Sequence, residues 1–362
     1  MILQRYILRE VSKAFLLIAT ILFTIIILTG PFLKFYKEYQ VVGPGFLADV
    51  IPYFIPQAAG YIIPLSILIA GVFVFGRLSE DNEITVIRYS GINLIKVLWP
   101  LAVLGLGISM FLLFLNVYVI PRALAATGVL SVNTIKNSIM SPSLINRTIK
   151  LPGGYQIYYN DIKDNVLSGV SVIQVNKNGA AYQHIKAQEG KIEFNDDTSK
   201  LSLTLKKVTE VTWDEKTNEP QVLPAPESLK SVLDLSSILI PKRKNLPAMT
   251  RRELDRMINK KETERFRLSE IMMEKMRRYS FSFAPLLFLL IGVPVGMFVN
   301  KGSKVAGIGI SALIVFLGYY PLTILFTYLG NNNVLNPYLA SWIPSVIMAF
   351  IVVILSYFVL RK

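Results

Sequence analysis

The sequence contains no cysteine and a single histidine, which removes several kinds of chemistry. Without cysteine the chain has neither disulfides nor thiolate metal sites. His184 lies in a polar stretch, where a lone histidine is more often a surface residue than a ligand. We therefore expect no metal site.

Motifs for nucleotide binding and hydrolysis are also missing. Gly190-Lys191 is followed by Ile192 instead of Ser or Thr, so it does not form a phosphate loop. The sequence has no nucleophile elbow and no His-Glu-x-x-His motif. We expect no catalytic residue and no cofactor on this chain.

Charge is scarce as well. Only 17% of the 362 residues are charged, whereas 52% are hydrophobic, and this composition indicates a polytopic membrane protein. The net charge of +14 does not point to nucleic acid, because no Lys/Arg-rich run is interleaved with stacking aromatic residues. Membrane topology and anionic lipid account for the excess better.

Six apolar runs approach or exceed the roughly 20 residues that a helix needs to span a bilayer. In chain order they are residues 14–33, 50–75, 95–120, 280–298, 305–329 and 340–360. They contain essentially no Asp or Glu, the residues that mark ion pathways in driven carriers. If the protein transports a substrate, we expect the energy to come from outside the chain.

The first 13 residues have the pattern of an amphipathic helix. Ile7 and Val11 share helical spacing with other apolar residues, and Arg5 and Arg9 lie on other faces. This pattern predicts a separate helix that lies in the membrane interface.

Residues 122–264 contain no run long enough to span a membrane. Leu201, Leu203 and Leu205 alternate with polar residues, the period of two that is typical of a strand with one buried face. We expect an antiparallel β domain, a sandwich or jelly roll, in which these leucines face inward. The predicted domains are then a membrane half at 1–121, the β domain with a proline-rich linker at 122–264, and a second membrane half at 265–362.

The β domain is followed by a helix start. Thr250-Arg251-Arg252-Glu253 has the spacing of a capping box, which predicts a polar helix leading toward the membrane. Glu274, Arg277 and Arg278 come just before the fourth apolar run.

Residues 76–93, GRLSEDNEITVIRYSGIN, form a charged segment between the second and third runs. Ser79 is a suitable N-cap, Glu80 and Glu83 bring negative charge to a first helical turn, and Gly91 suits a left-handed end. This predicts a helix at about 80–90.

The predicted helix is half apolar. Ile84 and Ile87 are three residues apart and share a face, and Arg88 lies near the end. Such a helix could dock into a soluble partner, or the segment could be a solvated loop that only obeys topology rules.

Basic residues set the expected orientation. In the short loops and termini they concentrate on one side, whereas the short loops on the other side carry only Lys34 and Lys37. Both termini and the 80–90 helix are therefore expected in the cytoplasm, and the β domain outside. Lys34 and Lys37 could snorkel to the headgroups or meet anionic groups of a substrate.

Together these stretches resemble the LptF/LptG permeases of the lipopolysaccharide export ABC transporter, with a closer likeness to LptF. The resemblance is carried by MILQRYILRE, IIPLSILIAGVFVFGRLSEDNEITVIRYSGIN, LNVYVIPRA, LPAMTRRELDRMI and EKMRRYSFSFAPLLFLLIGVPVG. It covers nearly the whole chain, and AQEGKIEFNDDTSKLSLTL is similar to a strand pair of the jelly rolls in this family.

The resemblance implies which proteins assemble with this chain and which lipid it handles. Two such permeases pair in the bacterial inner membrane on a dimer of LptB-like ATPases, which bind the ATP and Mg²⁺. Glu83 matches the acidic position of the helix that docks on the ATPase, and Glu80, Ile84, Ile87, Arg88 and Gly91 belong to the same segment. The first and fifth spans admit lipopolysaccharide, with Lys34 and Lys37 near its phosphates. The periplasmic jelly roll, including Leu201, Leu203 and Leu205, passes the lipid to an LptC-like protein.

Two other classes fit parts of the pattern. One is an ABC permease for another lipid or a MacB/FtsX-like mechanotransmission subunit, although those have four spans and a domain after the first. The other is a membrane scaffold, which co-purification of an ATPase would separate from the transporters.

The charge asymmetry generates a topological prediction. We expect Asn178 outside the cytoplasm and Asn82 inside it, because the basic loops stay in the cytoplasm. A phosphatase that works only in the periplasm should therefore be active when fused at Asn178, and a fluorescent protein that folds only in the cytoplasm should fluoresce when fused at Asn82. The reverse result at either position would refute the layout.

Overall fold

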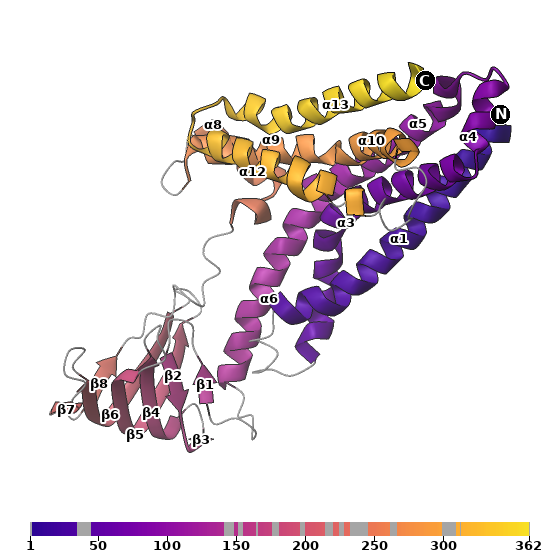
Figure 1. Cartoon of the computed structure of the whole chain (residues 1–362). Helices are drawn as coiled ribbons and strands as arrows, with labels where there is room; N and C mark the ends of the chain where they lie inside the picture. The colour runs from indigo at the N-terminus through magenta and orange to yellow at the C-terminus, as the bar shows by residue number, and fades with distance from the viewer. Residues whose placement is uncertain are drawn as a thin grey trace. The chain divides into compact units, whose positions relative to one another are not determined.

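A computed structural model describes the chain as two compact units (Figure 1). The helical unit comprises Met1–Leu33, Ile51–Ala126 and Asn245–Lys362, and the β unit comprises Lys34–Val50 and Thr127–Lys244. These boundaries differ from the predicted ones, because residues 245–260 pack on helices of the helical unit. The structure describes residues 2–34, 45–140, 148–150, 155–163, 166–175, 181–195, 200–213, 220–223, 228–231, 245–260, 266–298, 309–311 and 313–361.

Long helices make up the helical unit. In chain order the described helices are α1 (Ile2–Lys34), α3 (Gly45–Glu80), α4 (Glu83–Tyr89), α5 (Leu94–Phe114), η1 (Leu115–Val119), α6 (Ile120–Met140), η2 (Leu246–Ala248), α8 (Arg251–Lys260), α9 (Leu268–Ser282), α10 (Ala284–Phe298), η3 (Ile314–Tyr319), α12 (Tyr320–Asn331) and α13 (Pro337–Arg361). In Figure 1 α13 runs along α9 and α10, with α12 beside it.

Among the described residues, five helices are long and apolar enough to cross a membrane, and the number is six if a bent pair of helices counts as one span. The five are Ile2–Pro31, Ala48–Glu80, Lys96–Leu130, Gly309–Asn331 and Pro337–Phe358, and the pair is α9 with α10, bent by 41°. The helices break at Phe283, beside Pro285, whose ring nitrogen cannot continue the hydrogen-bond ladder. The predicted polytopic helical fold is confirmed.

Two spans contain a π-helical segment just before a proline. η1 precedes Pro121 and η3 precedes Pro321, and in both cases the next N–H, from Ile120 or Tyr320, bonds to the carbonyl five residues earlier. A π-turn accommodates the hydrogen bond that a proline cannot donate. For this reason the third span does not end at Ile120 as predicted: the candidate span reaches Leu130, and the helix α6 continues to Met140.

The N-terminal segment is not a separate interfacial helix, so that prediction is wrong. α1 runs without interruption from Ile2 to Lys34. Ile7 and Val11 are only 2% and 0% exposed and belong to the main hydrophobic core. The apolar face that was expected to enter lipid packs on protein instead.

α3 and α10 approach each other closely at glycines. A Cβ atom added to Gly296 would lie 2.7 Å from the Val72 carbonyl oxygen, and one added to Gly292 would lie 3.0 Å from the Leu68 carbonyl oxygen. Small residues at helix contacts let backbones pack against each other, which is how helices associate in lipid. These glycines therefore let α3 and α10 pack backbone to backbone within the helical unit.

The β unit contains one antiparallel sheet, in agreement with the predicted inserted antiparallel domain. Its strands are β1 (Thr148–Lys150), β2 (Tyr155–Tyr158), β3 (Asp161–Lys163), β4 (Val166–Val175), β5 (Ala181–Asn195), β6 (Lys200–Trp213), β7 (Pro220–Leu223) and β8 (Ser228–Ser231). They pair in the order β1-β2-β4-β5-β6-β7, with β3 also on β4 and β8 also on β6.

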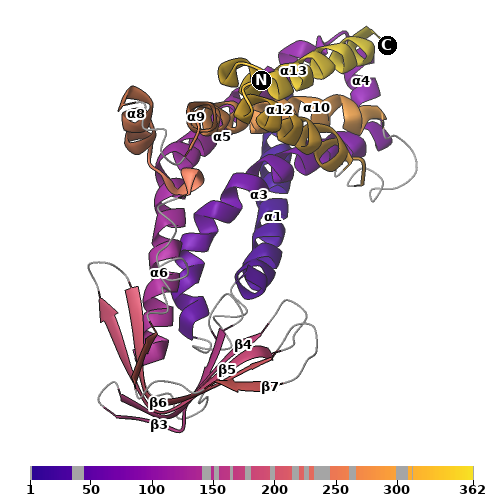
Figure 2. The same ribbon diagram turned by 90° about the vertical axis from the view of Figure 1, so that its left-hand side faces the viewer.

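A crease crosses the three central strands at Gly169, Gln188 and Lys207. These residues lie opposite one another but are not paired in the β ladder, whereas their neighbours on both sides are. Gly169 and Lys207 have positive φ angles of 61° and 54°. On β6 the buried positions switch from Leu205 to Val208 across the crease, so both arms of the sheet bury side chains on the same side. Figure 2 shows the sheet bent into two arms.

The glycine contact between α3 and α10 generates a stability prediction. Gly296→Leu should lower the unfolding temperature of the detergent-solubilised protein by several degrees, because a side chain would meet backbone. Gly107→Leu on α5 is the matched control, since no atom lies within 4 Å of its Cβ position. Equal melting temperatures for the two variants would contradict this account of the core.

Candidate coupling helix and its polar anchor

The segment expected to couple to a partner is a short helix after a tight turn. α3 continues through Ser79 to Glu80, and α4 starts at Glu83 after Asn82, whose φ is 59°. The predicted Ser79 N-cap is therefore wrong: its hydroxyl donates to the Met297 carbonyl at 3.4 Å instead. Glu80 ends α3 and does not lie in the first turn of α4.

The far end of α4 agrees with the sequence. Gly91 has a φ of 72°, and its N–H donates to the Arg88 carbonyl at 3.0 Å. No atom lies within 4 Å of a Cβ at Gly91, so the constraint on this position is conformational and not steric.

The two isoleucines of α4 face the interior of the chain. Ile84 and Ile87 are 6% and 9% exposed and belong to the same core as Ile7, Val11 and Leu78. The apolar face that was expected to dock into a soluble partner is buried within the chain instead, so these two side chains are not accessible to a partner in this structure. They hold α4 against its own unit.

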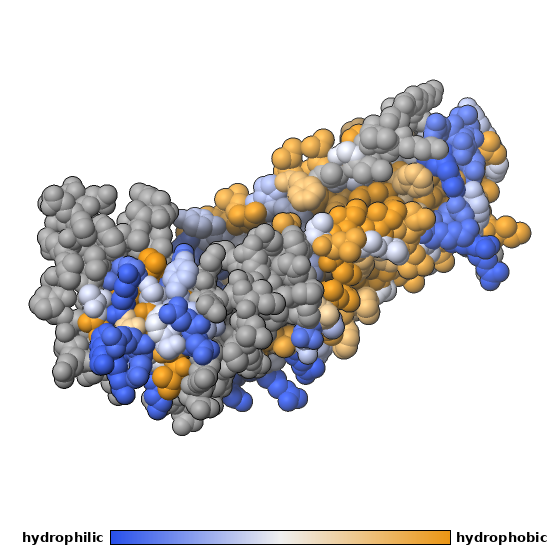
Figure 3. Space-filling view, turned by 90° about the horizontal axis from the view of Figure 1, so that it is seen from below, coloured by the Kyte–Doolittle hydropathy of each residue, from blue (hydrophilic) through white to orange (hydrophobic). Residues whose placement is uncertain are grey.

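The outward face of α4 carries a different apolar pair. Val86 is 62% exposed and Tyr89 is 88% exposed, and they lie three residues apart on one face. Sequence reasoning missed this pair, although its spacing was visible beside that of the isoleucines. Figure 3 shows hydrophilic residues gathered next to a broad hydrophobic surface, at the end of the helical unit where Figure 1 places α4.

The start of α1 holds α4 and its neighbours in place. Glu10 accepts a hydrogen bond from Arg77 near the end of α3 at 2.7 Å, and the Tyr6 hydroxyl donates to Glu83 at 3.4 Å. Gln4 donates to the Lys96 carbonyl at the start of α5 at 2.6 Å. Exposed ion pairs contribute only about 0–1 kcal/mol, so the burial of Ile7 and Val11 supplies most of the attachment. α1 and α4 are therefore packed against each other and should move together.

The residues predicted to meet substrate are only partly described. Lys34 ends α1, but its side chain and the whole of Lys37 lie outside the described residues. Leu205 is 1% exposed while Lys206 is exposed, which confirms the inward phase at that position. The side chains of Leu201 and Leu203 lie outside the described part of the chain.

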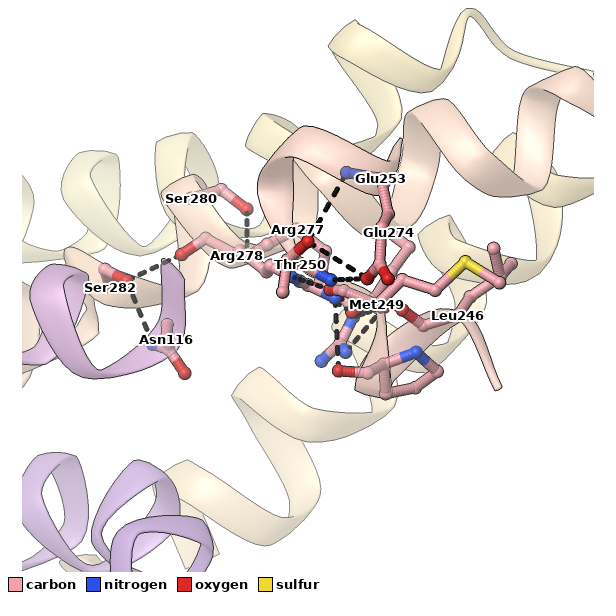
Figure 4. A network of polar contacts seen from close by, with 11 residues as sticks. Asn116, Leu246, Met249, Thr250, Glu253, Glu274, Arg277, Arg278, Ser280 and Ser282 are labelled. Atoms are coloured by element: carbon pink, nitrogen blue, oxygen red, sulfur yellow. Dashed lines mark hydrogen bonds and ion pairs between the residues drawn. The ribbon is translucent and has the colours of Figure 1, made fainter. Parts of the chain in front are cut away.

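A second arrangement, which sequence reasoning had not assembled, surrounds Arg278 of α9 (Figure 4). Its guanidinium donates to the carbonyls of Leu246, Pro247 and Met249 at 2.8–3.1 Å. It also pairs with Glu274 at 3.0 Å and is 7% exposed. One buried cation thus satisfies three carbonyls of the segment that enters α8.

Glu274 balances this charge from the same helix. It accepts bonds from Arg278 and, at 2.7 Å and 3.1 Å, from Arg277. A buried cation is tolerated only when it is paired and its hydrogen bonds are satisfied, and both conditions hold here. The spacing of Glu274, Arg277 and Arg278 at i, i+3 and i+4 was the only sequence signal for this network.

Two further contacts extend the network along the helices. The predicted capping box is confirmed, because Glu253 accepts the Thr250 N–H at 2.7 Å and the Glu253 N–H donates to the Thr250 hydroxyl at 3.4 Å. On the other side, Ser282 donates to the Arg278 carbonyl at 2.6 Å and accepts from Asn116 of η1 at 2.9 Å. The network therefore connects η2, α8, α9 and the π-turn of the third span.

The Arg278 network generates a stability prediction. Glu274→Gln should destabilise the helical unit by about 3–5 kcal/mol, because it removes one partner of a buried pair. Thermal unfolding of the purified chain in detergent measures this loss. Glu270→Gln, one turn earlier on α9, is the matched control and should have a much smaller effect. A loss of similar size in both variants would contradict the anchoring role.

The chain was compared with curated proteins and with models of protein families. No curated protein matches the chain. A family model described as "Lipopolysaccharide export system permease LptF/LptG" matches residues 5–357, which is nearly the whole chain and includes the inserted β domain. This model covers both LptF and LptG, so the closer likeness to LptF stays a prediction. The chain belongs to the LptF/LptG family of lipopolysaccharide export permeases.

Proposed function

We propose that this chain is one of two permease subunits in an ATP-driven lipopolysaccharide exporter, and that α4 receives motion from a separate LptB-like ATPase. The family is one of lipopolysaccharide export permeases, so the chain is a multi-pass inner-membrane transport subunit and not a catalytic enzyme. The observation that carries the proposal is α4 itself, a short helix fixed from behind and apolar in front. ATP and Mg²⁺ would bind the partner ATPase.

The burial pattern of α4 suits the transmission of force. Ile84 and Ile87 anchor the helix in the core, whereas Val86 and Tyr89 are available to a partner. Since each fully buried apolar side chain contributes about 1.5–3 kcal/mol, a push on the outer face should move α4 together with its core neighbours and not detach it. Glu83, which is half-buried beside Tyr6, would pair with a basic residue at the edge of such a contact.

The start of α1 provides a path for this motion. Arg77–Glu10 and Glu83–Tyr6 join the ends of α3 and α4 to the first turns of α1. α1 is a continuous helix, so a displacement at Glu10 is carried along its length. We propose that the ATPase opens and closes the lipid entrance through α1, and that Lys34, at which α1 ends, and Lys37, three residues later in the sequence, meet lipid phosphates.

The β unit would take up the acyl chains. Leu205, Val170 and Val208 are apolar and lie on the same side of the creased sheet. They are buried within the chain, so this side would have to open before hydrocarbon could enter it. Gly190 lies between Val170 and Leu205, where an added Cβ would lie 2.9 Å from the valine. We propose that this side passes the lipid toward an LptC-like periplasmic protein, with both termini in the cytoplasm.

The outward face of α4 provides the test of this proposal. The double variant Val86→Ala/Tyr89→Ala should reduce ATPase co-purification and weaken binding about 10–100-fold, because interface aromatic residues are often worth 2 kcal/mol or more. Its melting temperature should stay close to that of the wild type. Binding is measured by titrating the ATPase onto the purified chain.

Two further variants separate docking from folding. Trp99→Ala removes another exposed aromatic ring, 66% exposed on α5, and should leave ATPase binding unchanged. Ile87→Ala should lower both the melting temperature and ATPase binding, because it loosens α4 itself. Normal ATPase binding and lipid export by the Val86/Tyr89 variant would overturn the coupling role.

A further inference from the structure

α8 has one face fixed to the helical unit. Leu254 is 0% exposed and packs in a small core with Met249 and Ile271 of α9. The Thr250–Glu253 capping box and the Arg278 contacts hold the residues just before it. The rotation of α8 about its own axis is therefore fixed, and so is the face that it presents outward.

Both carboxylates of α8 are engaged close to its attached side. Glu253 bonds to Thr250. Asp255 lies 2.7 Å from the ammonium group of Lys275 on α9, an ion pair that is not aligned as a hydrogen bond, and 3.7 Å from Arg251. Asp255 is thus paired with two cations, and Glu253 is held by the hydrogen bonds of the capping box.

Three cations remain along the outward face. Arg252, Arg256 and Lys260 are exposed and follow one another at intervals of four residues, so they form a single stripe. Successive Cα atoms in such a stripe are separated by about 6 Å along the helix axis. Within the described residues, none of the three makes an ion pair or a side-chain hydrogen bond.

The neighbours of α8 place it where membrane spans end. It packs along α9, and the start of α9 bonds to the end of α12: Ser269 donates to the Asn331 carbonyl at 2.7 Å, and Arg267 donates to the Asn332 side chain at 3.3 Å. Asn331 closes one candidate span, and Pro337 opens the next. Figures 1 and 2 both show α8 beside the start of α9. We therefore expect the stripe to lie at the level of the lipid headgroups.

We propose that α8 is a lipid-binding helix, and that Arg252, Arg256 and Lys260 bind the phosphate groups of anionic phospholipids in the surrounding leaflet. Guanidinium and ammonium groups bind phosphate by charge-assisted hydrogen bonds, and basic residues beside membrane spans attract anionic lipid headgroups. Because Arg278 ties the same segment to the helical unit, bound headgroups would fix the point where the chain returns from the β unit. This inference does not depend on the proposed coupling to an ATPase.

Photo-crosslinking in nanodiscs tests the site. A benzophenone amino acid at Asn259, which is exposed on α8, is placed in the full-length chain with phosphatidylglycerol and phosphatidylcholine in equal amounts. Mass spectrometry should find mainly phosphatidylglycerol adducts. The triple variant Arg252→Gln/Arg256→Gln/Lys260→Gln should reduce these adducts at least fivefold, and high salt should reduce them in the wild type.

The matched control changes three exposed lysines of the β unit, Lys186→Gln/Lys191→Gln/Lys206→Gln, and should leave the adducts unchanged. The α8 variant must also melt at the wild-type temperature in detergent without added lipid. Equal capture of both phospholipids, unchanged capture by the α8 variant, or capture of a protein partner in place of lipid would each overturn the proposal. If lipopolysaccharide is added and forms the only adduct, the assignment to phospholipid is likewise refuted.

Discussion

The buried guanidinium of Arg278 is the contact on which the second half of the helical unit depends. It donates hydrogen bonds to the carbonyls of Leu246, Pro247 and Met249, where the chain returns from the β unit. Those carbonyls would otherwise lose their hydrogen bonds to water without replacement, and Glu274 supplies the opposite charge that the buried cation requires. This attachment fixes the segment that enters α8, and the burial of Leu254 then sets the orientation of the basic stripe.

α4 likewise has one buried face and one exposed face. Two of its side chains, Ile84 and Ile87, serve the fold, and two others, Val86 and Tyr89, remain outside. The start of α1 closes over the inner pair and adds the Arg77–Glu10 ion pair. In both places a short helix is fixed on one side by burial, so that its other side is presented in a defined direction. This arrangement suits an element that must receive force or bind a surface.

Features that depend on local chain chemistry were predictable. Apolar runs indicate spans because a bilayer offers no partners to polar groups, and the Thr250–Glu253 box and the left-handed Gly91 follow from spacing and from the lack of a Cβ. The helix starting at Glu83 was misplaced by a few residues, because Ser79 fits an N-cap equally well until Met297 competes for its hydroxyl. The continuity of α1 and of α5 through Pro121 was missed, since a proline or a charged turn is a local signal that neighbouring helices can override.

The sequence by itself determined the class of protein, the family, and the insertion of a β domain between two groups of spans. These follow from composition, periodicity and motif order, which do not require knowledge of contacts. Only the tertiary structure decided which face of α4 is buried, which side of α8 is basic, and what Arg278 holds. The physical reason is that a helical pattern specifies which residues share a face but not which face meets the core. That choice depends on contacts between residues as far apart as Ile7 and Ile84, or Leu246 and Arg278.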